Sequence, residues 1–135
     1  GAFGLLGDAD DASDRDLAIL RAIHGALKPG AAFVLTALSG LRMVRQHTPE
    51  EVASGAFDPI TMSEHSTMEV EGPEGTRAIE LRERGYAPTE LALMARLAGF
   101  EVVHIGGGTA GNWGHRPLDL DEMEIMLVAR KPSGG

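Results

Sequence analysis

Residues 26–38 read ALKPGAAFVLTAL, and this stretch decides the fold class because it joins the end of a helix to a buried strand. Pro29 ends the helix, since proline lacks an N–H group and disfavours helical geometry in the residue before it. Gly30 supplies the turn, and residues 31–38 are then almost wholly apolar. An uninterrupted apolar run, as opposed to an alternating one, is typical of a strand that helices cover on both faces.

A second junction of the same kind lies further along the chain. Pro88 stands at a first helical position, before a helix predicted over residues 89–98. Gly99 ends this helix, and residues 100–105 follow as a strand. Ala87 precedes the helix and lacks the side-chain oxygen of a good N-cap. The face expected to be buried carries Leu91, Met94 and Leu97. Helix–strand–helix–strand order predicts one α/β domain over residues 1–135, with mostly parallel strands.

The remaining segments are predicted from capping residues, turn residues and apolar spacing. They are a helix over residues 14–27 with Ser13 as its N-cap, a short helix over residues 49–54 with a capping box at Thr48, a β-hairpin with strands within residues 60–70 and 76–86, a glycine-rich loop over residues 106–121, and a final strand over residues 122–130.

The composition describes an acidic globular protein. Apolar residues make up 43%, and 12 basic against 20 acidic residues give a net charge of −8. This surplus of negative charge argues against nucleic acid and anionic membranes as partners, because both bind proteins largely through basic side chains. No run approaches the roughly 20 apolar residues of a membrane helix, and no signal peptide opens the chain. There is no cysteine to form a disulfide. We expect a cytoplasmic protein.

Two segments, taken in order, carry a resemblance to a known family. Residues 27–35 (LKPGAAFVL) and 90–103 (ELALMARLAGFEVV) resemble the second half of class I S-adenosylmethionine-dependent methyltransferases. Residues 2–5 look like the loop after that family's fourth strand, and residues 124–131 (EIMLVARK) look like its antiparallel last strand. The resemblance implies the C-terminal part of a Rossmann-like methyltransferase fold, with a β-hairpin insert in residues 41–86 as a lid on the substrate side.

The family's cofactor motif has no counterpart in this sequence. That motif is an acidic, glycine-rich loop after the first strand, with a ribose-binding acid at the end of the second. The resemblance therefore implies that the cofactor-binding first half lies outside this chain. It also implies contacts of Ala2, Phe3 and Gly4 with S-adenosylmethionine, because ligands bind at the carboxyl ends of the strands in open α/β sheets. Ordinary loop packing is the alternative for these three residues.

The glycine-rich loop carries the candidates on the substrate side. Residues 106–111 (GGGTAG) match G-x-G-x-x-G, but residues 112–117 (NWGHRP) do not favour the helix that a dinucleotide pyrophosphate requires, so we expect no nicotinamide site. The substrate-binding candidates are Asn112, Trp113, His115 and Arg116, together with Arg84 from the hairpin. They offer hydrogen-bond donors, a stacking surface and positive charge. Core packing for Trp113 and a surface ion pair for Arg116 are the alternatives.

The five histidines do not show the spacing of metal ligands, and we predict no metal site. His47 and His65 lie in the insert that would cover the active site. Either of them, with Glu64, could act as a general base if the acceptor must lose a proton. A surface position or a hydrogen-bonded core position is the alternative for each histidine.

Two functions from different classes fit this sequence. The first is S-adenosylmethionine-dependent methyl transfer to a small-molecule acceptor by a longer or assembled enzyme, a reaction that depends more on positioning than on acid–base groups. The second is a non-catalytic binding or assembly module derived from the same fold, whose open sheet edge is covered in a homodimer. The part of the natural gene product that precedes Gly1 separates the two.

Overall fold

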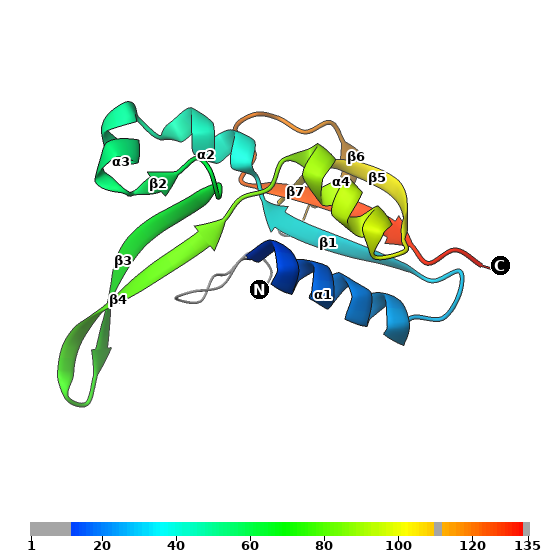
Figure 1. The fold of residues 1–135 in the computed structure, drawn as a ribbon, viewed down its shortest axis with the longest axis horizontal. Helices are drawn as coiled ribbons and strands as arrows, with labels where there is room; N and C mark the ends of the chain where they lie inside the picture. The colour runs from blue at the N-terminus through cyan, green and yellow to red at the C-terminus, as the bar shows by residue number, and fades with distance from the viewer. Residues whose placement is uncertain (1–11, 110–111, 134–135) are drawn as a thin grey trace.

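The computed structural model describes residues 12–109 and 112–133. In chain order its elements are α1 (Ala12–Ala26), β1 (Ala32–Leu38), α2 (Gly40–Gln46), α3 (Pro49–Ser54), β2 (Phe57–Asp58), β3 (Ser63–Gly72), β4 (Gly75–Arg84), α4 (Pro88–Leu97), β5 (Glu101–Thr109), β6 (Asn112–Arg116) and β7 (Glu124–Arg130) (Figure 1). Within these ranges no helix has the length and apolarity that crossing a membrane requires.

The main sheet has the strand order β1-β7-β5-β6, and all of its pairings are antiparallel. The expected antiparallel last strand is confirmed, but the expected mostly parallel sheet is wrong for the described strands. The reason is the position of β7, which pairs with β1 from Ala32↔Arg130 to Leu38↔Glu124 and with β5 along its other edge. Strands β1 and β5 therefore run in the same direction but do not pair with each other.

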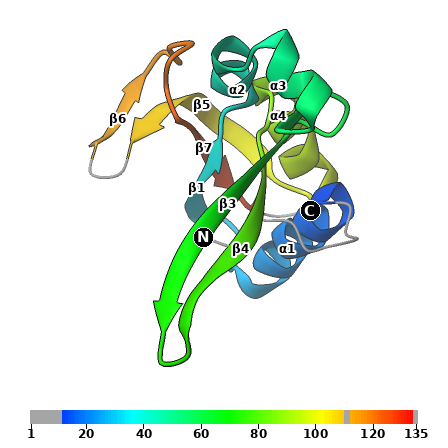
Figure 2. The same ribbon diagram turned by 90° about the vertical axis from the view of Figure 1, so that its left-hand side faces the viewer.

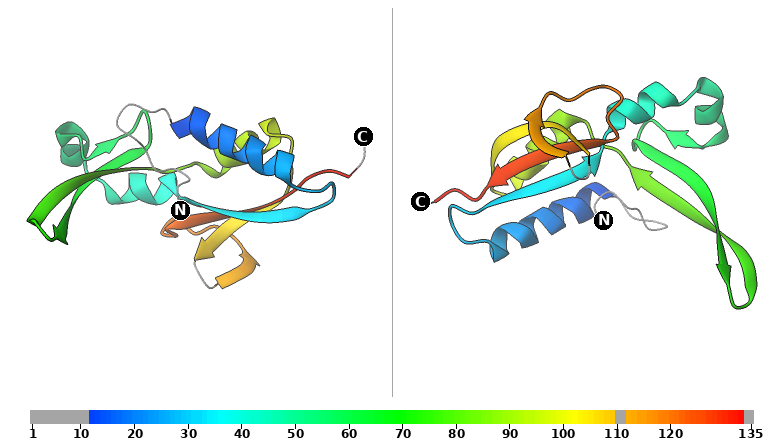
Figure 3. Two further views of the ribbon diagram at one scale, coloured as in Figure 1. Left: turned by 90° about the horizontal axis from the view of Figure 1, so that it is seen from below. Right: turned by 180° about the vertical axis from the view of Figure 1, so that it is seen from behind.

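Helices α1 and α4 lie on the same side of this sheet and cover one of its faces (Figure 3). Phe33 and Leu35 of β1 pack toward the core beneath the helices, and the Phe33 ring lies 4.7 Å from that of Phe100. Val34 points the other way and is 53% exposed. The prediction that helices cover β1 on both faces is thus wrong within the described residues. The buried core comprises Leu20, Ala37, Tyr86, Leu91, Met94, Ala95, Ala98, Phe100, Ile125, Leu127 and Ala129.

The predicted helix after Pro88 is confirmed as α4, with one correction to its buried face. Leu91 and Met94 are buried, but Leu97 is 61% exposed. At about 100° per residue, a position six residues along the helix has rotated away from the first. Ala95 and Ala98, at i+4 and i+7 from Leu91, occupy the buried stripe in its place.

The region predicted as a glycine-rich loop over residues 106–121 is largely strand, and that prediction is wrong. Strand β5 continues to Thr109, and β6 pairs back on it. The glycines allow close packing instead of a loop: a Cβ atom on Gly108 would lie 2.6 Å from Cβ of Met126, so only glycine fits there. The final strand begins at Glu124, two residues later than predicted.

The helix starts illustrate which local signals are reliable. Helix α3 has the predicted capping box, in which Glu51 N–H donates to Thr48 Oγ1 at 3.2 Å and Thr48 N–H donates to Glu51 Oε1 at 3.0 Å. Helix α1 begins at Ala12, so Ser13 lies inside its first turn and is not the N-cap as predicted. Helix α2 was not predicted, because it starts with glycine and its N-cap, Ser39, makes no side-chain capping bond.

Strands β3 and β4 form the predicted hairpin, with the short β2 on the other edge of β3. Their register runs from Ser63↔Arg84 to Gly72↔Gly75. We call residues 63–84 the arm, since it extends away from the rest of the molecule (Figures 1 and 2). Near its tip both faces are exposed, and Met68 is 47% exposed.

Candidate functional site

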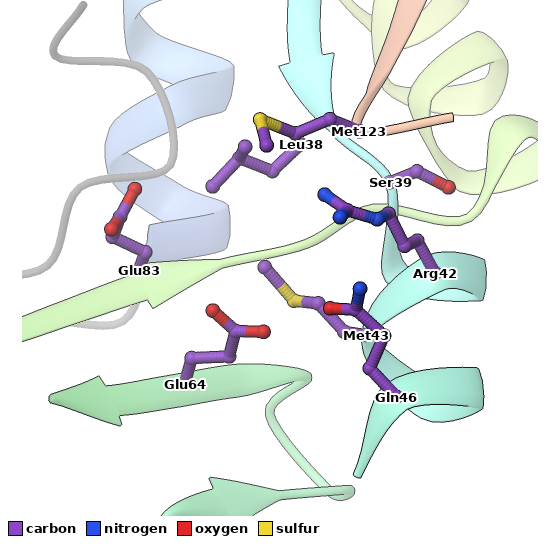
Figure 4. Close-up of a pocket in the computed structure, with 8 residues that line it drawn as sticks. All are labelled: Leu38, Ser39, Arg42, Met43, Gln46, Glu64, Glu83 and Met123. Atoms are coloured by element: carbon purple, nitrogen blue, oxygen red, sulfur yellow. The ribbon is translucent and has the colours of Figure 1, made fainter. Parts of the chain in front are cut away.

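A cavity of about 190 Å³ lies at the carboxyl end of β1, the location where open α/β sheets bind ligands. We call it the strand-end cavity. Its walls come from the end of β1, from α2, from the base of the arm and from the segment before β7 (Figure 4). The lining residues are Leu38, Ser39, Arg42, Met43, Gln46, Glu64, Glu83 and Met123.

Backbone hydrogen bonds hold the base of the arm against the end of β1. Tyr86 N–H donates to the Leu38 carbonyl at 2.8 Å, and Gly40 N–H donates to the Tyr86 carbonyl at 2.9 Å. The two backbone segments approach so closely that a Cβ atom on Gly85 would lie 2.8 Å from Cα of Gly40. Glycine at residue 85 therefore lets β4 reach the strand end and place Glu83 over it.

Glu64 and Glu83 are direct cross-strand partners at the base of the arm. Because residues opposite each other in an antiparallel pair share one face, both side chains project to the same side of the hairpin (Figure 4). Glu64 keeps 32% of its side chain exposed. The side-chain carboxylate of Glu83 makes no hydrogen bond or ion pair within residues 12–109 and 112–133.

His47 is held in a defined orientation beside Glu64. Its ring stacks on Phe57 at 4.8 Å, and Nδ1 donates to the Met43 carbonyl at 2.8 Å. The other ring nitrogen, Nε2, lies 3.8 Å from Glu64 Oε1 and 3.9 Å from Glu51 Oε2. With the proton fixed on Nδ1 in the neutral ring, Nε2 is the basic nitrogen and faces the carboxylates.

His65, the other candidate base, lies on the opposite face of the arm from Glu64. His65 is the cross-strand partner of Arg82, and it lines a separate hollow together with Ser54 and Thr67. Among the two predicted histidines, the structure therefore brings His47 to Glu64 and does not bring His65 there. A catalytic role for either residue stays a prediction.

Arg42 contributes the positive charge on the far wall of the cavity. With the Gln46 amide oriented so that its oxygen faces Arg42, Nη2 and Nε of Arg42 donate to it at 2.9 and 3.1 Å. The neighbouring Arg45 pairs with Asp121 at 3.0 Å on the surface. Sequence reasoning missed Arg42 and Gln46 because α2 was missed. The available signal was their position directly after a predicted buried strand, where site residues are common in this class of fold.

Arg84, a predicted substrate-binding residue, is buried at the junction of β4 and α4 and does not line the strand-end cavity. Its side chain is 9% exposed, its Nη2 donates to Glu90 at 2.5 Å, and its guanidinium lies 4.2 Å from the centroid of the Tyr86 ring. The Tyr86 hydroxyl donates to the buried Asp16 of α1. Burial and this bond to Asp16 raise the pKa of Tyr86 well above its ordinary value.

The other predicted site residues lie in β6 or outside the described residues. Ala2, Phe3 and Gly4 lie outside the described residues. The candidates of the former loop, Asn112, Trp113, His115 and Arg116, form β6, and only their backbone is described. The strand order puts β6 at the opposite edge of the sheet from β1. Within the described ranges no group of three or more histidine, aspartate or glutamate residues could hold a metal ion.

No protein-family model matches this sequence, and no curated protein matches it. Solved structures do. The chain is similar to the CcbJ methyltransferase of Streptomyces caelestis, with a TM-score of 0.67 and 23% identity over 96% of this chain and 56% of that one. An S-adenosylmethionine-dependent methyltransferase of Methanosarcina mazei matches 90% of this chain and 53% of its own, with a TM-score of 0.58 and 14% identity.

A third such match is an S-adenosylmethionine-dependent methyltransferase of Clostridium acetobutylicum, with a TM-score of 0.56 and 12% identity over 90% of this chain and 52% of that one. This chain thus spans about half the length of the methyltransferases it matches. The expected resemblance is confirmed: the chain has the fold of part of an S-adenosylmethionine-dependent methyltransferase domain.

Proposed function

We propose that this chain supplies the acceptor side of an S-adenosylmethionine-dependent methyltransferase that acts on a small molecule, as part of a longer or assembled enzyme. The observation that carries the proposal is the structural match to 96% of this chain in a methyltransferase. The strand-end cavity supports it, because the cavity lies where ligands bind in α/β folds.

S-adenosylmethionine, when bound, supplies a methyl group on a positively charged sulfur atom. The protein's task in such a reaction is to hold the acceptor atom in line and to exclude water. In this chain Leu38, Met43 and Met123 give the cavity an apolar wall, while Arg42 and Glu64 give it polar groups that can orient an acceptor.

The described residues do not fit the cofactor by themselves. No strand within residues 12–109 or 112–133 is followed by an acidic, glycine-rich loop that leads into a helix. We therefore propose that Ala2, Phe3 and Gly4 contribute contacts to the cofactor, and that most of its site comes from elsewhere in the longer or assembled enzyme. His47 or His65 as a base, and Arg84 and the β6 residues as substrate contacts, belong to the same proposal.

The test is calorimetric titration of the natural full-length gene product with S-adenosylmethionine, after its intact mass has been measured. We expect a gene product longer than this chain that binds S-adenosylmethionine saturably. On turnover, the bound cofactor should be converted to S-adenosylhomocysteine. A product of 14.2 kDa that binds no cofactor would refute the proposal.

That refuting result would favour the second function, a non-catalytic assembly module. One observation supports it: within the described residues β1 pairs only with β7, which leaves its other edge open. Open edges are commonly covered by pairing with another chain. Sedimentation of the natural product would then give a homodimer, whereas a monomer without cofactor binding would contradict both functions.

A further inference from the structure

The strand-end cavity has opposite charges on two of its walls. Arg42 and Gln46 come from α2, whereas Glu64 and Glu83 come from the base of the arm. Figure 4 shows the Arg42 guanidinium and the Glu64 carboxylate directed into the space between α2 and the arm. None of the ion pairs among residues 12–109 and 112–133 joins the two walls. The cavity therefore keeps a cation apart from two carboxylates and does not close on an ion pair.

The α2 wall offers hydrogen-bond donors. Two N–H groups of Arg42 donate to the Gln46 amide oxygen, and the other guanidinium N–H groups have no partner in the described part of the chain. A guanidinium has five N–H donors and no acceptor. Because the amide oxygen of Gln46 faces Arg42, the two N–H donors of that amide point away from Arg42 and are also free to bond a ligand.

The wall formed by the arm offers hydrogen-bond acceptors. Ionised carboxylates only accept hydrogen bonds, and Glu64 and Glu83 stand directly opposite each other in the hairpin. Like charges in that position destabilise a sheet, and donors from a ligand would relieve the repulsion. The one basic group recorded beside Glu64 that is not on α3 or the α2 wall is His47, whose Nε2 lies 3.8 Å from Oε1.

This distribution of charge selects against simple ions. A cation in the cavity would face the Arg42 guanidinium, and an anion would face two carboxylates, so each meets a like charge. A zwitterion would have to lose the hydration of two charges, a cost that only nearly ideal pairing at both ends recovers. A hydroxyl group carries no charge and is donor and acceptor at once. A neutral molecule with several hydroxyl groups can therefore bond both walls.

The size of the cavity and its apolar residues limit the ligand further. At about 190 Å³ the cavity is smaller than a typical site for a drug-sized ligand, which is ~300–1,000 Å³. It has room for a single ring. Leu38, Met43 and Met123 lie between the two polar walls and offer apolar surface (Figure 4). The C–H groups on the face of a sugar ring match that surface, while its hydroxyl groups project to the sides.

We propose that the strand-end cavity binds a neutral sugar ring, whose hydroxyl groups accept from Arg42 and Gln46 and donate to Glu64 and Glu83. The inference rests on the proposed methyltransferase function and names its acceptor as a sugar hydroxyl. On methylation the hydroxyl oxygen forms a bond to the methyl carbon and gives its proton to Glu64, beside His47. The carbon–sulfur bond of the sulfonium donor breaks, and its electron pair stays on sulfur.

The test is NMR titration of the natural full-length protein with ring compounds that differ in charge or in hydroxyl groups. The probes are methyl β-D-glucopyranoside, the cation of D-glucosamine, the anion D-glucuronate, and cyclohexanol; alanine serves as a small zwitterion. We expect the glucoside to shift the amide signals of residues 42, 46 and 64. It should bind at least ~10-fold more tightly than every other probe, because only the glucoside pairs both walls without meeting a like charge.

Two variants test the walls separately. Arg42→Met removes the cation, so it should weaken glucoside binding at least ~10-fold and reverse the order of the charged sugars in favour of glucosamine. Glu64→Gln should shift the order toward glucuronate. The matched controls are Arg45→Met, which makes the same change on α2 at a residue paired with Asp121, and Glu69→Gln on β3; neither residue lines the cavity. Both controls should bind the glucoside as the unaltered protein does, and melting curves check that all four variants fold.

The outcomes separate this inference from the proposed function. Tighter binding of cyclohexanol, alanine or either charged sugar than of the glucoside would overturn the sugar site, as would equal losses in Arg42→Met and Arg45→Met. A separate titration with S-adenosylmethionine tests the methyltransferase. Cofactor binding without a preference for the glucoside refutes only the sugar site, whereas that preference without cofactor binding refutes only the methyltransferase.

Discussion

The body of the molecule and the arm are stabilised in different ways. In the body, β1, β7 and β5 share one core with α1 and α4, and Leu20, Leu91 and Leu127 are fully buried. The arm has two long strands whose outer halves contact little besides each other. Its stability there rests on ladder hydrogen bonds and cross-strand pairs, which contribute less than apolar burial. The body therefore carries most of the stability, which leaves the arm free for recognition.

Truncation of matched apolar side chains should show the largest contrast. Leu127→Ala in the centre of β7 should lower the free energy of unfolding by about 2–5 kcal/mol, because Leu127 is fully buried and leaves a cavity. Met68→Ala on the arm should cost less than ~1 kcal/mol, since the side chain is 47% exposed. Urea denaturation followed by circular dichroism measures both. Equal losses would show that the arm is as tightly packed as the body.

The junction between the two regions should be the next most sensitive position. Gly85→Ala places a Cβ atom 2.6 Å from Met43 Sδ and 2.8 Å from Cα of Gly40. Such overpacking typically costs about 1–3 kcal/mol, and here it should also separate the arm from the strand end. Gly25→Ala is the control: that position has nothing within 4 Å, and alanine in α1 should stabilise by about 0.5–1 kcal/mol. Thermal melts that move in the same direction for both variants would contradict this account.

The buried hydroxyl of Tyr86 should make the body sensitive to alkaline pH. Its pKa is raised above the ordinary 10.0, first by burial and then by the bond to Asp16, so the folded state holds this proton more tightly than the unfolded chain. The stabilisation is therefore complete below pH 10 and declines as the pH rises further.

Tyr86→Phe should lower the free energy of unfolding at neutral pH by about 1–3 kcal/mol, because it removes the hydroxyl that donates to a buried carboxylate. It should also flatten the decline above pH 10. Denaturation at pH 8 and pH 11 separates the two effects, and an unchanged pH slope in the variant would show that another group is responsible.

The smallest effect is expected at the capping box of α3, beside the arm. Thr48→Ala removes the oxygen that accepts from Glu51 N–H, and such caps are worth about 1 kcal/mol. Thr48→Ser should keep the bond and serve as the control. Hydrogen exchange of the α3 amides should rise in the alanine variant only, and core amides of β7 should be unaffected in both.

Local chemistry predicted much of this fold. Proline and glycine residues at the ends of the elements located β1, α3 and α4 within a residue or two, and the turn at Gly72–Gly75 identified the hairpin. These signals act within a few residues of each other, so the sequence displays them directly. The sequence does not display the pairing partner of each strand in this way. Strand β7 comes to lie between β1 and β5 only through long-range contacts, and those with β1 join residues about ninety positions apart.

The candidate site was predictable only in part for the same reason. Glu64 and His47 could be named from their place in the insert. Glu83 could not be named in the same way, because its place in the cavity depends on the register that sets it opposite Glu64. Arg42 lies on a helix that begins with glycine and has no side-chain capping bond, so its one signal in the sequence was its position directly after the predicted strand. Arg84 was predicted to bind the substrate, but its side chain meets Glu90 and Tyr86 and does not line the strand-end cavity.

The central place of β7 has a consequence for how the protein is made. This strand leaves the ribosome after every other strand of the described sheet, yet it forms the middle of the sheet between β1 and β5. Until it emerges, β1 has no partner in the described sheet and β5 has only β6, so their apolar faces are exposed during synthesis. Translation that stalls before residue 124 would thus release a chain that chaperones and proteases treat as unfolded, although most of the elements of the fold have already been synthesised.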